Sequence, residues 1–274
     1  MIWPFRPNFR KQIARIEISG AIAAPMRKRI LEALKTVEER KFPAILLRID
    51  SPGGTVVDSQ EIHAEIERLR EKHGTKVIAS FGNISASGGV YIGVSADRIV
   101  ANSGTITGSI GVILRGNNLE KLLDRVGVSF KTIKSGPYKD ILAFDRELTD
   151  PERDILQALI DSSYHQFVTA VSKGRKLEPE KVREFADGRI FTGQQALDLG
   201  LVDRLGTEED ARRWACELVG LDPEKTQTFA IEAPKSALDR ALNRSQTIAR
   251  LNAATSWMDF ELTTNGQPLW MYHP

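Results

Sequence analysis

A nearly continuous apolar run, AILLRID at residues 44–50, is the feature that most limits how this chain can fold. An apolar run of this length without polar alternation is typical of a strand buried on both faces, as in a parallel sheet covered by helices. The cluster DSPGG at residues 50–54 ends the strand. Amphipathic helical patterns flank it, at residues 26–41 and around Ile62 and Ile66. A strand between two such helices predicts an α/β fold.

Strand and helix patterns alternate along the rest of the chain. Further strand patterns occur at 12–19, 76–81, 98–102, 109–114 and 128–133. Helical patterns occur at 88–96, 118–126, 151–173, 178–186, 193–199 and 208–219. This order predicts a mainly parallel sheet, built of repeated β-β-α and βαβ units and covered by helices. We expect three parts: a basic aromatic arm at 1–11, the folded domain at 12–222, and a C-terminal helix (235–253) with a tail within 223–274.

Composition and charge narrow the classes of function. The chain has 274 residues, and its net charge of +2 leaves no excess of basic residues that would favour nucleic acid as a partner. Cys216 is the single cysteine, so no internal disulfide can form. We expect it to be a small buried residue on a helix, since free cysteines usually are.

The N-terminus combines aromatic and basic residues. No run of about 20 apolar residues is seen, so no transmembrane helix is expected. A secretory signal is not seen either, which favours a cytoplasmic location. Trp3, Phe5 and Phe9 alternate with basic residues within 1–15, a composition that suits peripheral contact with an anionic bilayer. A solvated arm is the alternative.

Two glycine-rich turns follow consecutive strand patterns, DSPGG at 50–54 and SASGG at 85–89. A serine at a strand-to-helix turn has an exposed hydroxyl, and the amides that follow it lie at the positive end of a helix. Two such turns at neighbouring strand ends could each donate an N–H to one oxyanion. Plain turns and a phosphate cradle are alternatives, although neither GxxxxGK[ST] nor GxGxxG occurs, and no cofactor or metal is expected.

A serine nucleophile needs a general base. The histidines do not lie in turns at strand ends, and we expect ordinary surface or half-buried positions for His63, His73, His165 and His273. Lysine is the other option, provided that burial or nearby positive charge lowers its pKa. The turn-rich segment 134–140 follows a strand pattern and offers two candidates, Lys134 and Lys139.

Five motifs occur in order along residues 12–220: RIDSPGG (48–54), ASGGVY (86–91), TGSIGV (107–112), SGPYKD (135–140) and ADGRIFTG (186–193), the last followed by ALDLGLVD (196–203). Together they resemble the signal peptide peptidase A (SppA) family in its single-domain form. One SPGG turn would be a weak signal, whereas five motifs in the same order are highly specific.

The resemblance implies a ClpP/crotonase-like fold and a serine endopeptidase with a Ser–Lys dyad. Ser87 matches the nucleophile and Lys139 the general base. Ser109 matches the hydroxyl that orients the lysine, and the backbone amides of Gly54 and Gly88 match the oxyanion hole.

The same resemblance implies that Gly53, Ser85 and Gly89 lie along the bound peptide. The implied substrates are remnant signal peptides or membrane-protein fragments, and the implied assembly is a homo-oligomeric ring. A neutral lysine base also requires that the carboxylate of Asp140 turn away from Lys139, so we expect Asp140 to bond elsewhere.

Two features depart from the family pattern, and two other functions compete. We expect no N-terminal membrane anchor of the usual kind, and residues 223–274 match no motif. A crotonase-type acyl-CoA hydratase or isomerase would share the fold, but it needs acidic catalysts and no serine nucleophile. A non-catalytic scaffold should have lost the serine or the lysine, whereas this chain keeps both.

Overall fold

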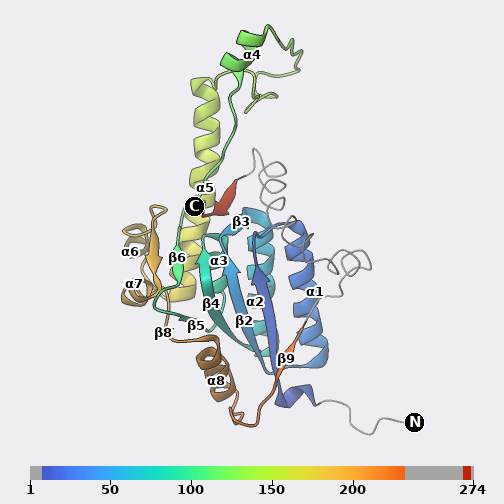
Figure 1. Cartoon of the computed structure of the whole chain (residues 1–274), viewed down its shortest axis with the longest axis vertical. Coiled ribbons are helices and arrows are strands. Elements are labelled where there is room, and N and C mark those ends of the chain that lie inside the picture. The colour runs from blue at the N-terminus through green and yellow to red at the C-terminus, as the bar shows by residue number, and fades with distance from the viewer. Residues whose placement is uncertain (1–7, 232–267, 273–274) are drawn as a thin grey trace, which may run out of the picture.

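The structure is a computed structural model that describes residues 8–231 and 268–272. Figure 1 shows a twisted sheet with helices on both faces, from which a long helix and a green segment project at one end. No helix among the described residues is long and apolar enough to cross a membrane.

The main sheet follows the strand order β7-β6-β4-β2-β1-β9, and β5 pairs with both β4 and β8. Its strands are β1 (Ile13–Ser19), β2 (Ala44–Ser51), β4 (Lys76–Ala86), β5 (Arg98–Ala101), β6 (Ile106–Gly108), β7 (Ile190–Thr192), β8 (Arg204–Leu205) and β9 (Thr228–Ala230). Within the described strands, the pairs of this sheet are parallel except for β6 with β7. The predicted mainly parallel sheet is therefore confirmed.

A second, two-stranded sheet joins distant parts of the sequence. Strand β3 (Gly53–Thr55) pairs antiparallel with β10 (Leu269–Met271). The helices are α1 (Ala24–Arg40), α2 (Val56–His73), α3 (Gly88–Gly93), α4 (Glu120–Val126), α5 (Asp150–Arg175), α6 (Pro179–Arg183), α7 (Gly193–Asp198) and α8 (Glu208–Leu218), with a 3-10 turn η1 (Phe9–Lys11) before β1.

The continuous apolar run in β2 is explained by burial of both faces. Ile45 and Leu47 belong to the large core cluster that includes residues of α1 and α2. Leu46, from the opposite face, packs in a separate cluster with Ala215 and Cys216 of α8. Cys216 is fully buried, as the sequence predicts.

Two predicted strands do not form. Residues 109–114 contribute only an isolated bridge at Ile113, and the strand next to β4 is instead β6, a few residues earlier. Residues 128–133 form no regular element, and Phe130 and Ile133 are exposed. Their strand-like composition has no effect here because a strand is stable only when a partner strand and a packed face are available.

The projecting segment, residues 114–149, leaves the sheet after β6 and returns through α5, and we call it the extension (Figure 1). Helix α5 contains 26 residues, so it is about 39 Å long at 1.5 Å per residue. Near its C-terminal end Phe167 and Val171 are fully buried, whereas Ile155 and Leu159 near its N-terminal end are exposed. One end of α5 therefore belongs to the core and the other supports the extension.

The outer parts of the chain differ from the sequence-based expectations. Strand β9 lies beside β1, before the helix expected at 235–253, and β10 lies beside β3, where a tail was expected. The expected helix at 235–253 lies outside the described residues, and the boundary at 222 stays a prediction. In the expected membrane arm, Trp3 and Phe5 also lie outside the described residues.

Phe9, the third aromatic residue of that arm, packs against the protein itself. Its ring centroid lies 5.0 Å from that of Phe42 and 5.4 Å from that of Phe229. Arg40 places its guanidinium 4.9 Å from the centroid of the Phe9 ring. The expectation that Phe9 serves a bilayer surface is therefore corrected: the ring fills a gap between α1 and β9.

Gly174 lets α5 approach the core closely. A Cβ added there would lie 2.2 Å from the backbone oxygen of Val94. Replacing glycine by alanine inside a helix ordinarily adds up to about 1 kcal/mol of stability, but a backbone oxygen cannot move aside. We expect Gly174→Ala to lower the free energy of unfolding by about 1–3 kcal/mol, measured by urea denaturation. Gly104→Ala, where an added Cβ meets nothing within 4 Å, is the matched control. A Gly174→Ala protein as stable as the control would contradict this packing.

Candidate active site

Ser87 stands between the end of β4 and the start of α3 in a strained backbone conformation. Its φ of 52° and ψ of −115° are unusual for a residue with a side chain, at a cost of about 1–3 kcal/mol. Its backbone N–H donates to the carbonyl of Gly108 at 2.8 Å. The hydroxyl is buried and has no hydrogen-bond partner among the described residues. A strained serine whose hydroxyl is unused is typical of a residue held for chemistry.

The two glycine-rich turns meet beside Ser87, as the sequence predicts. Gly53 has a φ of +105°, and a Cβ on it would lie 2.7 Å from the backbone nitrogen of Gly88. A Cβ on Gly54 would lie 1.9 Å from the carbonyl oxygen of Ile22. Only glycine fits at either place, because backbone occupies the space of a side chain. The two turns thus bring their peptide groups together without intervening side chains.

Ser109 follows the neighbouring strand end. Gly108 of β6 pairs with Ala86 of β4, so Ser109 and Ser87 come directly after paired residues. Ser109 is also in a positive-φ conformation, at 51°, and its N–H donates to the carbonyl of Arg189 at 2.7 Å. The structure therefore brings Ser109 to the same edge of the sheet as Ser87.

Ser85 and Gly89 contact the end of β2, next to the turn that carries Ser87. The Ser85 hydroxyl is fully buried and donates to the carbonyl of Ile49 at 2.6 Å. A Cβ on Gly89 would lie 3.1 Å from the carbonyl oxygen of Ser51. Both residues fix β4 and α3 against the end of β2, so the Ser85 side chain is not presented to a bound peptide.

Lys139 lies on the extension and does not meet Ser87 within one chain. It is exposed in a turn where its N–H donates to the carbonyl of Gly136 at 3.3 Å. Its amine makes no ion pair or side-chain hydrogen bond with the described residues. The connection between α4 and α5, which contains this turn, lies beside α4 at the far end of the molecule from the sheet (Figure 1).

Asp140 is turned away from Lys139, as expected. Its carboxylate accepts from Arg146 at 2.9 Å and from the Lys134 amine at 2.6 Å. These hydrogen bonds, that of Arg146 first, lower the pKa of Asp140 to about 2. The Lys134 amine is therefore already engaged by a carboxylate, which makes it the poorer candidate for a base.

Arg146 connects the loop that carries Lys139 to the start of α5. It donates to the carbonyl and carboxylate of Asp140 and to both carboxylate oxygens of Glu152. Hydrogen bonds from Arg146, followed by one from the backbone of Thr149, lower the pKa of Glu152 to about 2. This three-residue network holds the loop in a fixed position relative to α5.

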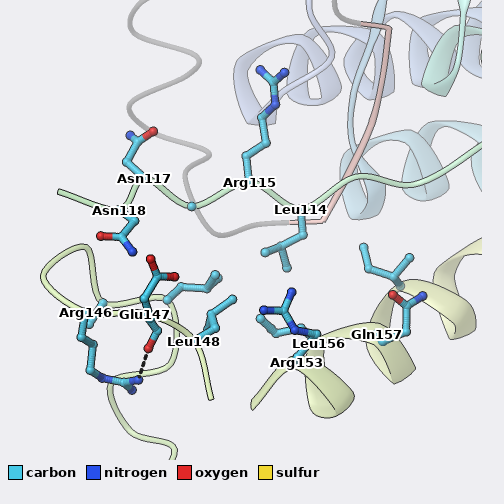
Figure 2. A pocket seen from close by; sticks show the side chains of 14 residues that line it. Leu114, Arg115, Asn117, Asn118, Arg146, Glu147, Leu148, Arg153, Leu156 and Gln157 are labelled. Atoms are coloured by element: carbon cyan, nitrogen blue, oxygen red, sulfur yellow. Dashed lines mark hydrogen bonds between the residues drawn. The ribbon is translucent and has the colours of Figure 1, made fainter. Parts of the chain in front are cut away.

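An open pocket of about 500 Å³ lies between this loop, the start of the extension and α5. Figure 2 shows Leu114, Leu148 and Leu156 at its walls, with the Arg153 and Arg146 side chains nearby. It contains neither the serine nor the glycine turns. The described residues hold no cluster of three or more His, Cys, Asp or Glu side chains that could bind a metal ion.

His63 is more buried than its surface-like pattern predicted. Its Nδ1 lies 2.8 Å from the carbonyl oxygen of Tyr91, and only 8% of the residue is exposed. Burial lowers the pKa of its imidazole. The residue ties α2 to α3, so its role is structural, while His73 and His165 are exposed as expected.

Strand β10 lies across the site, and nothing in the sequence predicted it. Its partner β3 includes both Gly53 and Gly54. On its other side, Leu269 exchanges two backbone hydrogen bonds with Ile113, at 2.9 and 3.1 Å. Three residues, LWM, carry no periodic signal, and their partners are more than 150 positions away in the sequence, so no local pattern could reveal the pairing.

Comparison with known proteins identifies the group to which these features belong. The sequence profile of Peptidase family S49 matches residues 69–222. A Synechocystis sp. protein, slr0021, which carries a provisional protease name, is 66% identical over 278 residues, or 99% of this chain and 100% of that one. The chloroplastic serine protease SPPA of Arabidopsis thaliana is 36% identical over 211 residues, 72% of this chain but only 31% of that protein.

The fold also has a counterpart among solved structures. A ClpP1 mutant from Listeria monocytogenes superposes with a TM-score of 0.51 over 74% of this chain and 95% of that chain, at 16% identity. At this identity the likeness concerns the fold alone, and it confirms the expected ClpP-like architecture.

The Arg146 network makes a prediction about the loop that carries Lys139. Arg146→Ala should increase backbone amide hydrogen exchange across residues 134–149 by about tenfold, while exchange in β2 stays unchanged. Arg153→Ala, which replaces an exposed arginine in the first turn of α5, is the control. Unchanged exchange in Arg146→Ala would show that the network does not fix the loop.

The lowered pKa values of Asp140 and Glu152 predict how exchange in this loop depends on pH. Because the folded pKa values of Asp140 and Glu152 are lowered, their stabilising effect is present above their ordinary values near 4 and is lost as the pH falls through about 2. Exchange at pH 4.5, corrected for the intrinsic rate, should therefore match that at pH 7.

Proposed function

Because this chain belongs to peptidase family S49, we propose that it is a serine endopeptidase in which Ser87 is the nucleophile and Lys139 the general base. The observation that carries the proposal is Ser87 itself. It is strained, its hydroxyl is unpartnered, and the two glycine turns meet next to it. A nucleophile held beside paired backbone amides is the arrangement that acyl transfer requires.

The proposed reaction begins with transfer of the serine proton to the lysine. The neutral amine of Lys139 accepts the Ser87 proton as the hydroxyl oxygen attacks the substrate carbonyl. The backbone N–H groups of Gly54 and Gly88 donate to the oxyanion that forms. The protonated amine then gives its proton to the leaving amine, and a water molecule, activated by the same lysine, hydrolyses the acyl-enzyme. Ser109 orients the lysine amine toward Ser87.

The lysine of each site comes from a neighbouring copy of the chain in this proposal. Lys139 is exposed and belongs to the extension, which projects from the sheet (Figure 1), whereas Ser87 lies between the end of β4 and the start of α3. All the large apolar residues of the described chain that are exposed, except Val57 and Ile190, belong to the extension or the start of α5: Leu119, Leu122, Val126, Val128, Phe130, Ile133, Tyr138, Phe144, Ile155 and Leu159.

So much exposed apolar surface on one projecting element is typical of an interface. A ring of copies, in which each extension lies over the next sheet edge, would cover this surface. It would also bring a lysine to each serine, and burial between copies would favour the neutral form of the amine. Substrates in this proposal are apolar peptides, such as remnant signal peptides or membrane-protein fragments. Residues 1–15 would provide any contact with the membrane through Trp3 and Phe5.

The dyad and its origin can be tested together. Ser87→Ala and Lys139→Ala should each abolish cleavage of an internally quenched apolar peptide, and the double variant should be no worse than either, since the two groups act as one unit. Mixing the two inactive single variants should restore part of the activity, because some interfaces then combine an intact serine with an intact lysine. Lys134→Ala is the control and should remain active.

Two outcomes would contradict this assignment. Activity in Lys139→Ala with loss in Lys134→Ala would identify Lys134 as the base. If mixing restores nothing although the copies exchange, as followed by energy transfer between labelled chains, the serine and lysine act within one chain.

The pH dependence tests the role of the amine. Only a neutral amine can accept the serine proton, and a free lysine titrates near pH 10.4. We expect kcat/KM to rise with pH along a single ionisation and to reach its maximum at neutral to alkaline pH. Ser109→Ala should lower the rate by about 10–100-fold. A rate that falls between pH 6 and 9, while circular dichroism shows a folded protein, would rule out a neutral lysine.

A further inference from the structure

The pocket in the extension is a second concave site, separate from Ser87. Its volume of about 500 Å³ falls within the range of about 300–1,000 Å³ that is usual for small-molecule sites. Three segments of the chain enclose it: residues 114–118, residues 142–148 and the part of α5 between 153 and 160 (Figure 2). The proposed reaction assigns no role to this pocket, so its residues call for an explanation of their own.

Contacts between the three segments hold the walls of the pocket in place. The N–H of Leu119 donates to the carbonyl of Phe144 at 2.6 Å, which ties the outgoing segment of the extension to the returning one. A Cβ on Gly116 would lie 3.0 Å from the Leu142 side chain, so the same two segments also touch there. The Arg146 network joins the returning segment to α5. Walls that are bonded to one another form the pocket before any ligand enters it.

The wall contributed by α5 follows helical spacing. Arg153, Leu156, Gln157 and Ile160 line the pocket, and their spacing of i, i+3, i+4 and i+7 places them on one face of the helix. Ile155 lies on the opposite side of α5 and belongs to the exposed apolar surface that is proposed above to pack against a neighbouring copy. The pocket is therefore distinct from that surface. Its other apolar wall residues are Leu114, Leu142, Ala143 and Leu148.

Arg153 is a cation of this pocket whose charge is not compensated by the described residues. Its guanidinium makes no ion pair or hydrogen bond with them, whereas Arg146 is paired with Asp140 and Glu152. Arg115 points away from α5 (Figure 2). A guanidinium presents two parallel N–H groups that match the two oxygens of a carboxylate. Arg153 is thus suited to bind a carboxylate that enters the pocket.

Glu147 provides the opposite charge on another side of the pocket. Its backbone carbonyl accepts from Arg146 at 3.1 Å, which fixes the main chain there. Its carboxylate makes no ion pair or hydrogen bond with the described part of the chain. Figure 2 shows Glu147 and Arg153 apart, with Leu148 between them in this view. A ligand that spans the apolar walls can therefore place a positive group at one end and a negative group at the other.

We propose that this pocket binds a short apolar peptide with both ends free, its carboxylate at Arg153 and its ammonium group at Glu147. Apolar side chains of the peptide contact the leucine walls between the two charges. A fatty acid or an amine would satisfy only one of the charges, and a polar peptide would lose the apolar contacts. Binding does not depend on Ser87, although short products of an endopeptidase carry the same two ends.

Occupancy of the pocket also bears on the loop that carries Lys139. Residues 142–148 form one wall of the pocket and follow Lys139 closely in the sequence. A ligand that contacts this wall and α5 at the same time stabilises the arrangement in which both are in place. Bound peptide should therefore slow local opening of the returning segment of the extension.

Calorimetric titration of Ser87→Ala, which does not consume the peptide if Ser87 is the nucleophile, tests the assignment. Tri-leucine with free ends should bind with a Kd of the order of 10–100 µM, and tri-serine should show no binding up to about 1 mM. N-acetyl-tri-leucine lacks the ammonium group, and tri-leucine amide lacks the carboxylate. Each of these blocked peptides should bind about fivefold more weakly than the free tripeptide.

Variants of the pocket assign the two ends of the peptide. Arg153→Ala should weaken binding of tri-leucine about fivefold and leave binding of the amide unchanged, because each change removes the same ion pair. Glu147→Gln should do the same with the N-acetyl peptide. Arg153→Lys keeps the charge and should recover most of the affinity. Arg125→Ala, which replaces an exposed arginine of α4 outside the pocket, is the matched control and should bind as Ser87→Ala does.

Hydrogen exchange locates the bound peptide on the protein. At a concentration of ten times Kd, tri-leucine should slow exchange in residues 114–118 and 142–157 by up to about tenfold and leave residues 53–55 and 87–93 unchanged. Protection of 53–55 and 87–93 instead would place the peptide at the serine and overturn the inference. It would also be overturned by the absence of binding at about 1 mM, or by equal affinity of Arg153→Ala, Glu147→Gln and the control for the free tripeptide.

Discussion

The pairing of β2 with β4 is the constraint on which the site depends. The two strands run parallel and in register from Ala44 to Ile49, then shift by a bulge, after which Ser51 lies opposite Ser85. The hydroxyl of Ser85 donates to the carbonyl of Ile49 and fixes that shift. Because parallel strands end at the same edge, the turn after each strand meets the other there, and the closeness of Gly53 to Gly88 follows from the pairing.

The core and the extension are stabilised by different kinds of interaction. In the core, β2 is buried on both faces and pairs with β1 on one side and with β4 on the other. The extension is held by charge instead, through Arg146 with Asp140 and Glu152, while its apolar side chains face outward. An element that keeps its shape through polar contacts and presents apolar ones is built to pack against something else. Under the proposed mechanism, the separation of Lys139 from Ser87 within one chain is the catalytic counterpart of that incompleteness.

The sequence predicted the core better than it predicted the extension and β10. The run in β2 and the glycine turns gave the parallel sheet and the meeting of Gly53 with Gly88, because these depend on local pattern and on strands that follow one another. The strand expected at 128–133 was wrong because its alternation reflects exposed apolar residues on the extension and not a sheet. The place of Lys139 depends on how the extension projects, and β10 depends on a partner far away in the sequence. Neither the place of Lys139 nor the pairing of β10 produces a periodic pattern in the sequence.

Gly53 and Gly88 leave a strand edge without side chains, and this edge bears on both the proposed chemistry and the position of β10. Side chains on Gly53 and Gly88 would collide with the Trp270 carbonyl and with each other's backbone, so the edge must remain bare for any peptide carbonyl to reach the amides. A bare strand edge readily pairs with other chains and is a liability when left uncovered. β10 covers that edge with a strand of the same chain.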